Sequence, residues 1–424
     1  MPAARTKAVV VICDGMRRDL VSAQRTPQIW DLKSRSRWCA AHRSVFPSVT
    51  RSSSASIATG CHPARHGLHG NTMALPDASG YAVHNVGEPE FVGRLRAATG
   101  RTLRVPTAAE RLRDHGGSIV FSNVSPGAAY FQDPDGHGHV YHRSGSYGPG
   151  CAPLPAADHL AVTHDSAGDW RMTERFCEEI LRDRRPALAV LWLCEPDHMQ
   201  HDAVLGSPEH LAVMAAADRC VGAVAATVER LRAAGEDIVL MVGSDHGHET
   251  IRASIPVERL LYEQGYKRAL DSGDIVLAPQ GTSALLYFAA DATDRVTAVG
   301  DFLRAQPWTG EVLVDRELER AGMRAEQGLR IALSMAKDDG ANAHGICGLS
   351  DVATRFEPTP RKIGMGQHGG FGTYEQAPFL LAHGNAFAPG EHLGATCIVD
   401  IAPTVMRHLG LSTAGMEGRA LQGA

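Results

Sequence analysis

The sequence lacks the paired cysteines that hold metal ions or exchange disulfides. It has nine cysteines, an odd number, and none of them forms a C-x-x-C pair. Cys13, Cys194 and Cys220 lie in apolar runs, where a free thiol behaves as a small hydrophobic side chain. A disulfide-stabilised secreted fold is therefore not indicated, and we expect reduced cysteines in a cytoplasmic protein.

Long apolar runs are also missing. No uninterrupted stretch reaches the roughly 18 residues that a membrane helix needs. Residues 1–7 lead directly into the strand-like run AVVVICDG, which is too short for the apolar region of a secretory signal. From the sequence we therefore expect neither a membrane span nor a signal peptide.

The chain has no surplus of positive charge. Its formal net charge is −5 and its isoelectric point is about 6.5, so we do not expect a nucleic-acid polymer as its partner. Lysine is absent between Lys33 and Lys267. Histidine, in contrast, occurs 21 times, which favours a metal site because histidine is the commonest metal ligand.

Four continuous apolar runs predict buried parallel strands, at residues 7–13, 118–122, 187–194 and 238–243. Helical stretches lie between them. The clearest is 207–234, with Ser207 as N-cap, Pro208 in the first turn and Gly235 after the end. Strands that alternate with helices predict an α/β fold with a mostly parallel central sheet flanked by helices.

The region 250–362 has a different character, because it mixes helical segments with short strands. The strands are expected at residues 275–278, 283–288 and 311–314. We interpret this region as an inserted, smaller α+β cap domain. The catalytic core then comprises 1–249 and 363–424, and the length of 424 residues fits one large core with one insertion.

A second irregular stretch, 124–160, is rich in Gly, Pro, His and Tyr and contains His137, His139 and His142. It is either an excursion that flanks the active site or an ordinary long loop, and long loops are often functional. The sequence leaves its role open.

Acidic and histidine side chains follow the predicted strands where each strand ends. Asp14 follows the first strand, Asp245 and His246 follow 238–243, and Asp197 follows 187–194. His201 lies four residues after Asp197, so both side chains face the same way on a helical turn. Carboxyl ends of parallel strands form the active-site edge of such sheets. Asp and His are zinc ligands, although each pair alone is equally compatible with a helix cap or polar turn.

The segment 46–60 places Thr50 before a helix-compatible stretch, with Ser52 or Ser53 as the expected cap. A hydroxyl at a helix N-terminus lies in a field that suits a nucleophile and a bound phosphoryl group. A threonine hydroxyl needs a base or a metal ion to react. The role of Thr50 therefore depends on the predicted metal site.

Several motifs occur in an order and spacing that resemble a known family. They are D-G at 14–15, F-P-x-x-T at 46–50, A-T-G-x-x-P-x-x-H-G-x-x-G-N at 58–71, E-P-D-x-x-x-H at 195–201, S-D-H-G at 244–247, H-G-G at 368–370 and D-I-A-P-T at 400–404. This pattern resembles the nucleotide pyrophosphatase/phosphodiesterase branch of the alkaline phosphatase superfamily, which includes phosphonoacetate hydrolase. The resemblance implies an alkaline phosphatase-like core.

The resemblance also implies two zinc ions and a set of site residues. One zinc would be held by Asp14, Thr50, Asp245 and His246, and the other by Asp197, His201 and His368. Thr50 would be the nucleophile and would form a covalent phospho-threonine. Asn71 would hydrogen-bond a phosphoryl oxygen together with the backbone near Thr50.

Two departures from the family pattern concern the substrate. Nucleotide-cleaving members carry an aromatic residue after the nucleophile, but here Arg51 follows Thr50. Arg51 is either a ligand for an anionic group of the substrate or a solvated surface residue. Phosphonoacetate hydrolases bind their carboxylate with lysines after the third strand, and this chain has none there.

The expected activity is hydrolysis of a small phosphodiester or phosphonate. A phosphonoacetate hydrolase-type enzyme that cleaves a C–P bond and a phosphomonoesterase are the alternatives within the same site. A phosphomutase or transferase and a non-catalytic scaffold are more distant alternatives. The sequence leaves the oligomeric state open, and a homodimer is one expectation.

Overall fold

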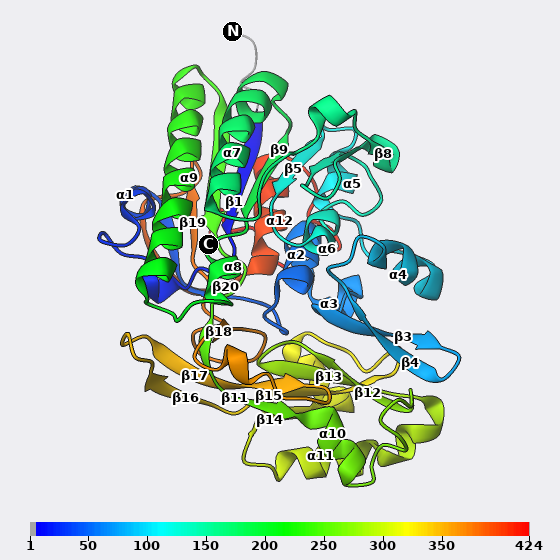
Figure 1. Ribbon diagram of the computed structural model, residues 1–424. Helices are drawn as coiled ribbons and strands as arrows, with labels where there is room; N and C mark the ends of the chain where they lie inside the picture. The colour runs from blue at the N-terminus through cyan, green and yellow to red at the C-terminus, as the bar shows by residue number, and fades with distance from the viewer. Residues whose placement is uncertain (1–5, 424) are drawn as a thin grey trace.

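A computed structural model describes residues 6–423. It shows two parts, a larger core at the top of Figure 1 and a lower part with smaller sheets. The predicted core begins at residue 1, so its first five residues lie outside the described part of the chain. In Figure 1, β1 runs from the top of the core down toward the smaller sheets.

A ten-stranded sheet forms the centre of the core, in the order β20-β2-β19-β10-β1-β9-β5-β6-β7-β8. Its strands are β1 (Thr6–Cys13), β2 (Arg37–Arg43), β5 (Ser118–Ser122), β6 (His139–Tyr141), β7 (Tyr147–Gly148), β8 (Ala152–Pro153), β9 (Leu188–Leu193), β10 (Asp237–Gly243), β19 (Leu380–His383) and β20 (Gly390–Cys397). The central strands β10, β1, β9 and β5 are mutually parallel, whereas β19 is antiparallel to both of its neighbours. The mostly parallel sheet predicted from the four apolar runs is confirmed.

Side chains alternate between the two faces along each strand, and both faces of this sheet are apolar, so helices cover both of them. Val9 and Val11 of β1 belong to the apolar cluster on one face, and Val10 and Ile12 belong to the cluster on the other. The first face is covered by α1 (Pro27–Ser34), α7 (Ser166–Arg175) with its π-helical continuation Phe176–Arg184, and α9 (Pro208–Ala233). The second is covered by α2 (Thr50–Thr59), α5 (Ala108–Leu112), α6 (Pro126–Tyr130) and α12 (Ile401–His408).

Helix α9 begins as the sequence predicts. Ser207 is its N-cap, and the side-chain oxygen accepts a hydrogen bond from the backbone N–H of His210. By length and composition α9 is apolar enough to span a membrane, although Asp218 and Arg219 interrupt its apolar run. However, 61% of its most apolar window is buried inside the fold, as is usual for the core helix of a globular domain.

The lower part contains two four-stranded sheets, ordered β16-β17-β11-β18 and β12-β13-β15-β14. Their elements are β11 (Glu249–Pro256), α10 (Val257–Glu263), β12 (Ile275–Pro279), β13 (Ser283–Phe288), α11 (Val296–Arg304), β14 (Thr309–Val314), β15 (Leu329–Met335), β16 (Lys337–Ala341), β17 (Cys347–Thr354) and β18 (Gly366–Gln367). The three short strands predicted in this region are confirmed as β12, β13 and β14.

The lower part packs on the core through a shared apolar cluster. Phe46 and Ala55 from the core contact a cluster that also contains Val276 and Leu285. The hairpin of β3 (Thr72–Asp77) and β4 (Gly80–Asn85) lies beside β12, between the two parts (Figure 1). The short helix α3 (Pro63–His66) and α4 (Phe91–Thr99) complete this side of the core.

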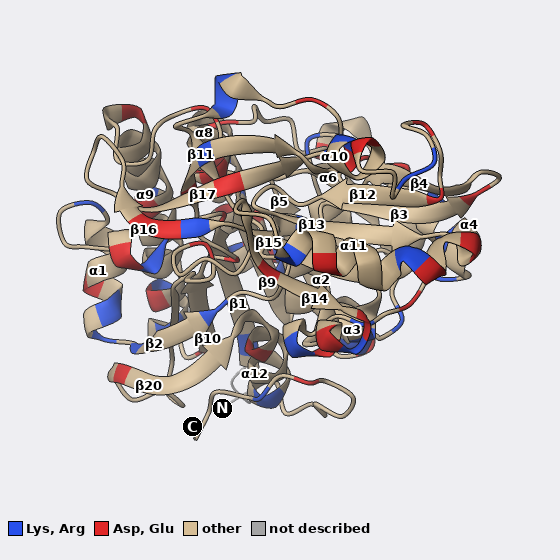
Figure 2. Ribbon diagram, turned by 90° about the horizontal axis from the view of Figure 1, so that it is seen from below, with Lys and Arg blue, Asp and Glu red and all other residues tan. Residues whose placement is uncertain are grey.

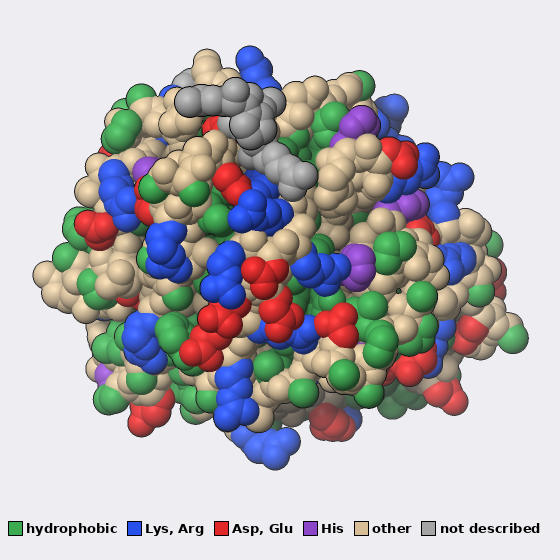
Figure 3. All heavy atoms as spheres, turned by 90° about the horizontal axis from the view of Figure 1, so that it is seen from above, with side chains coloured by type: hydrophobic (Ala, Val, Ile, Leu, Met, Phe, Trp, Pro, Cys, Tyr) green, Lys and Arg blue, Asp and Glu red, His purple; other side chains and the backbone are tan. Residues whose placement is uncertain are grey.

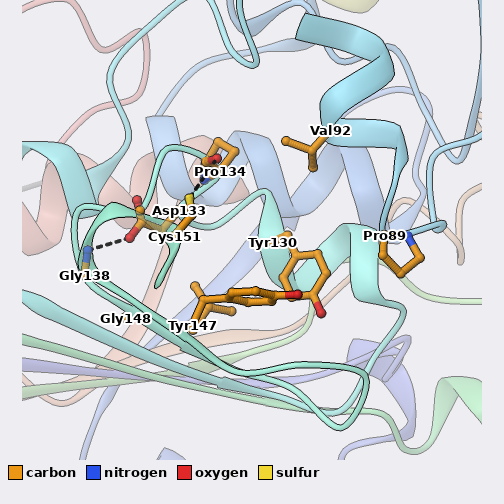
Figure 4. A pocket seen from close by; sticks show the side chains of 11 residues that line it. Pro89, Val92, Tyr130, Asp133, Pro134, Gly138, Tyr147, Gly148 and Cys151 are labelled. Carbon is orange, nitrogen blue, oxygen red and sulfur yellow. Dashed lines mark hydrogen bonds between the residues drawn. The ribbon is translucent and has the colours of Figure 1, made fainter. Parts of the chain in front are cut away.

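The 124–160 excursion is folded, and it extends the main sheet through β6, β7 and β8. The carboxylate of Asp133 accepts hydrogen bonds from the backbone N–H groups of His137, at 2.9 Å, and Gly138, at 2.6 Å. Figure 4 shows this region around a hollow of about 180 Å³, lined in part by Tyr130 and Tyr147. Among the described residues, the three histidines of the excursion join no cluster of metal-ligand atoms.

Charges of both signs are interspersed over the elements seen from below (Figure 2) and over the surface seen from above (Figure 3). On α4, Arg94 lies 3.4 Å from Glu88, and Arg96 lies 2.6 Å from Asp135. Exposed pairs of this kind stabilise a fold by about 1 kcal/mol at most. They do, however, leave these arginines with acidic partners.

Candidate metal centre

The carboxyl ends of three adjacent strands deliver most of the predicted site residues. Asp14 follows β1, Asp245 and His246 follow β10, and Asp197 opens the short helix α8 (Asp197–Gln200) after β9. Because β9 and β10 flank β1 on either side, these residues meet at one edge of the sheet. His368 reaches the same place from the segment that follows β18.

Asp14, Asp245 and His246 form the first cluster, with ligand atoms that all lie within 4.8 Å of one another. His246 Nε2 is 3.4 Å from Asp14 Oδ1 and 3.3 Å from Asp245 Oδ2. All three side chains are buried. Thr50 Oγ1 lies 3.2 Å from His246 Nε2, so the predicted nucleophile borders this cluster.

Asp197, His201 and His368 form the second cluster, together with His248. His201 Nε2 is 3.5 Å from Asp197 Oδ2, and His368 Nε2 is 3.5 Å from Asp197 Oδ1. The rings of His246 and His368 stack with their centroids 3.6 Å apart, so the two clusters are neighbours.

Sequence reasoning did not select His248. Its Nε2 lies 2.7 Å from Asp197 Oδ1, and its ring is fully buried. The available signal was its position two residues after His246, which returns a side chain of an extended chain to the same side. That signal is weak, because it does not say which face points to the site.

Backbone carbonyls orient the imidazoles of both clusters. His368 Nδ1 lies 2.7 Å from the carbonyl of Ser48, and His246 Nδ1 lies 3.1 Å from that of Gly247. With Nδ1–H donating to a carbonyl, Nε2 of each ring keeps its lone pair for a metal ion. The carboxylates are positioned too: Trp192 donates to Asp14 Oδ2 at 2.8 Å, and the Gly15 N–H donates to Asp245 Oδ1 at 3.2 Å.

The buried carboxylates fit a divalent cation. Asp14 Oδ1 and Asp245 Oδ2 are buried and have no hydrogen-bond partner among the described residues. Burial, followed by the nearby charges of Asp245 and Asp197, raises the pKa of Asp14 well above its usual value. A cation would offset this repulsion, and carboxylate oxygens with imidazole nitrogens are suitable donors for zinc.

Helix α2 places Thr50 differently from the sequence expectation. The expected cap, Ser52 or Ser53, is wrong, because both serines lie inside the helix and the N-cap is Val49. Ser52 Oγ donates instead to the carbonyls of Pro47 and Val49. Thr50 is thus the first residue of the helix, with its side chain beside the first metal cluster.

Asn71 supplies the capping acceptor that α2 lacks in its own sequence. Its Oδ1 accepts a hydrogen bond from the backbone N–H of Arg51 at 3.1 Å, and its own backbone N–H donates to Gln280 Oε1 at 2.6 Å. These bonds hold the side-chain amide beside Thr50. Its Nδ2 donor makes no hydrogen bond within the described residues, so it remains available for a ligand.

A cavity of about 470 Å³ opens over the two clusters. Its wall includes the predicted residues Asp14, Thr50, Arg51, Asn71, Asp197, His201 and His368. Arg51 thus faces the cavity, and its binding of an anionic substrate group stays a prediction. Asp245 and His246 lie beneath this wall, at the first cluster.

A family model for type I phosphodiesterase/nucleotide pyrophosphatase matches residues 8–307. The chain belongs to this family. Its enzymes are metal-dependent hydrolases of phosphodiester or pyrophosphate bonds in small molecules, and the two clusters provide candidate metal ligands at the expected edge of the sheet. No match was found among curated proteins.

Solved structures of murine ectonucleotide pyrophosphatase/phosphodiesterase 5 share the fold. One of them aligns with a TM-score of 0.68 and 20% identity, covering 97% of each chain. A second, an inactive variant in complex with AMP, aligns equally well. At this identity the likeness concerns the fold alone, and it confirms the α/β architecture with a large mixed sheet.

Proposed function

We propose that this chain hydrolyses a phosphodiester with two zinc ions and that Thr50 is the nucleophile. Membership of the family supports a hydrolase of phosphodiester or pyrophosphate bonds. The observation that carries the finer proposal is the position of Thr50. It begins α2, faces the cavity, and has its hydroxyl 3.2 Å from a histidine of the first metal cluster.

The metal ligands follow from the two clusters. Asp14, Asp245, His246 and Thr50 would hold one zinc, and Asp197, His201 and His368 the other. Bound there, the ions would lower the pKa of the threonine hydroxyl and neutralise the charge of the substrate oxygens. His248 joins the second set either as a ligand or as the partner that orients Asp197.

Thr50 and Asn71 act directly on the phosphoryl group. The hydroxyl of Thr50 gives up its proton to solvent, and its oxygen attacks phosphorus. The bond to the leaving group breaks, the departing alkoxide takes a proton from water to become the alcohol, and a phospho-threonine forms. The amide of Asn71, fixed by the Arg51 N–H, donates to a phosphoryl oxygen whose charge grows in the transition state. The N-terminus of α2 favours that charge as well. Water afterwards cleaves the threonine phosphoester.

The alternative activities differ in the kind of phosphorus compound that this cavity would have to bind. The inactive murine relative binds AMP, which supports a phosphate ester as a ligand of this fold. C–P cleavage of phosphonoacetate type, phosphomonoesterase activity and phosphoryl transfer remain outcomes of the test.

The test combines metal analysis with kinetics. We expect about two zinc ions per chain by mass spectrometry of the purified protein, and hydrolysis of bis-p-nitrophenyl phosphate that chelators abolish. Thr50→Ala should lower kcat by a factor of roughly 10³ or more, because the nucleophile is lost. Thr50→Ser should retain part of the activity, since it keeps a hydroxyl.

A matched control is available on the same helix. Thr59 ends α2, and its hydroxyl donates to the Ala55 carbonyl at 2.7 Å. Thr59→Ala should leave kcat within a factor of about two, since Thr59 stands at the opposite end of α2 from Thr50. Equal activity of wild type and Thr50→Ala would overturn the proposal. Turnover of phosphonoacetate alone, or of p-nitrophenyl phosphate alone, would select one of the alternatives.

Three further proposals remain from the sequence. We propose a core of 1–249 and 363–424 with a cap of 250–362, which the two separate four-stranded sheets support. We also propose a cytoplasmic protein, supported by nine cysteines that are all free. Limited proteolysis would check the first, and counting reactive thiols in the denatured protein would check the second. Light scattering would decide between a monomer and the expected homodimer.

A further inference from the structure

Two arginines line the cavity without an acidic partner. Arg51 comes from α2, and Arg143 comes from the 124–160 excursion. In the part of the chain that the structure describes, no Asp or Glu forms an ion pair within 4.0 Å of either guanidinium. Both arginines are half-buried, and a cation partly removed from water is normally paired with an anion.

Arg51 is held in place by polar contacts that leave its charge uncompensated. Its Nε donates to Ser125 Oγ at 3.0 Å. A Cβ on Gly87 would lie 2.6 Å from its Nη2, so the glycine provides the space for the guanidinium. Burial lowers the pKa of Arg51, and the carboxylates that oppose this effect are Asp197 and Asp14, both in the proposed metal clusters. With cations bound there, Arg51 has no other anion to face.

Arg143 is anchored by one nitrogen only. Its Nη1 donates to the carbonyls of Asn123, at 2.5 Å, and Val124, at 2.7 Å. The Nε and Nη2 atoms of Arg143 make no hydrogen bond within the described residues. Residues 123–125 form the turn after β5, so both arginines are fixed on the same turn, Arg143 through its carbonyls and Arg51 through Ser125. This arrangement presents free N–H donors from two forks to one cavity.

The other charges in the cavity wall are already satisfied. Glu88 pairs with Arg94 at 3.4 Å, and Asp202 pairs with Lys362. The remaining acids of the wall, Asp14 and Asp197, belong to the metal clusters. Positive charge is therefore what this cavity has in surplus once cations occupy the clusters.

The cavity has no Phe, Tyr or Trp ring among its described lining residues on which a nucleobase could stack. Stacking on an aromatic ring is a major source of affinity for a base. The wall therefore suits a charged substituent better than a planar apolar one.

We propose that Arg51 and Arg143 bind a second anionic group of the substrate, a carboxylate or a phosphate, while the reacting phosphorus lies at the metal clusters. This inference rests on the proposed phosphodiesterase function and specifies its substrate class. The substrate is then a small phosphodiester in which one alcohol carries an additional negative charge.

The experiment uses the zinc-loaded full chain and matched diesters. The parent compound is phenyl p-nitrophenyl phosphate. Three derivatives carry a carboxylate, a phosphonate or a neutral carboxamide on the phenyl ring. We expect kcat/KM for one of the charged compounds to exceed that for the carboxamide by roughly 10- to 100-fold, as charge-assisted hydrogen bonds would provide. The carboxylate and phosphonate compounds distinguish the two kinds of anion.

Variants assign this preference to the arginines. Arg143→Met and Arg51→Met should reduce the charged-to-neutral ratio toward one, and Arg143→Lys should keep part of it because it retains charge without the fork. Arg96→Met removes a surface cation that pairs with Asp135, and the ratio should not change. If Arg143→Met fails to fold, the charged-to-neutral ratio of kcat/KM in Arg143→Lys is compared with that of the wild type, and an unchanged ratio would contradict the role of Arg143.

A binding measurement separates the two proposals. Calorimetry on zinc-loaded Thr50→Ala should show tighter binding of phosphonoacetate than of phosphonoacetamide, with the difference lost in the Thr50→Ala/Arg143→Met double variant. Absence of hydrolysis of every diester by wild type would overturn the proposed function. Hydrolysis of charged and neutral diesters with equal kcat/KM, and equal binding of the two phosphonates, would overturn only the second-anion site.

Discussion

At the scale of single residues, His248 shows how one buried ring completes a metal cluster. Its Nε2 contacts Asp197 Oδ1, and the ring has room because two glycines face it. A Cβ on Gly15 would lie 2.8 Å from His248 Nε2, and one on Gly366 would lie 3.0 Å from Nδ1. Gly15 also has a φ of +68°, a conformation that side chains other than glycine adopt at a cost. Three positions far apart in sequence therefore depend on one another.

We predict that His248→Ala weakens metal binding at the Asp197 cluster by roughly 10- to 100-fold, the usual effect of losing a ligand's orienting partner. The measurement is zinc titration in competition with a chromogenic chelator. His42 offers a control, because its buried ring contacts Thr396 Oγ1 at 2.9 Å, away from the clusters. Zinc affinity should be unchanged in His42→Ala, and an unchanged affinity in His248→Ala would refute the role given to His248.

At the scale of elements, α2 is the helix on which the proposed chemistry depends. It is buried on nearly every side, which explains its small residues: Ser54 Oγ donates to the Ala128 carbonyl at 2.5 Å, and Ser56 Oγ lies 3.0 Å from His66 Nε2. Its first turn has no side-chain cap of its own, and Asn71 from the segment before β3 takes that place. Positioning of Thr50 therefore requires a second element.

The two functions of Asn71 can be separated by substitution. Asn71→Asp keeps an oxygen that accepts from the Arg51 N–H, but it loses the amide donor and adds a negative charge beside the substrate. We expect kcat/KM for bis-p-nitrophenyl phosphate to fall by a factor of roughly 10² or more, the usual cost of one transition-state donor. Thermal stability should change little in Asn71→Asp and fall in Asn71→Ala, which loses the cap. Equal activity of wild type and Asn71→Asp would exclude the donor role.

At the scale of the whole molecule, buried histidines tie stability to pH. Burial lowers the pKa of His42, His69 and His142 to about 3 and that of His210 to about 4, from 6.5. At these four histidines the unfolded chain therefore binds more protons than the folded one below pH 6.5. Stability from these groups is complete above that pH and falls as the pH decreases toward 3. Buried carboxyl groups oppose this trend in the metal-free protein, because burial raises the pKa of Asp14 well above its usual value, that of Asp169 to about 6 and that of Glu249 to about 7.

We predict a decrease in the urea midpoint of the metal-free protein between pH 7.0 and pH 5.5. Each histidine contributes up to about 1.4 kcal/mol per pH unit, and the buried histidines with a lowered pKa outnumber the buried carboxyl groups with a raised pKa. His42→Gln should reduce the pH dependence by up to one proton without removing it. A midpoint that stays constant over this range would contradict the buried, neutral state of these rings.

The sequence by itself determined the family, the α/β class and the positions of the metal-ligand candidates. This was possible because these features are local: apolar runs of strand length read as buried strands, and the strand-end residues Asp14, Asp197 and Asp245 stand directly after them. Parallel strands then bring their ends to one edge without further information.

The tertiary structure alone decided which other side chains share that edge. His248 contacts Asp197 across 51 positions, Arg51 contacts Ser125 across 74, and Asn71 caps a helix that begins 21 residues earlier. The excursion 124–160 reads as an irregular loop, yet it extends the sheet and delivers Arg143 to the cavity. The physical reason is that such contacts depend on how loops are packed against the sheet, and packing between distant segments leaves no periodic pattern along the chain.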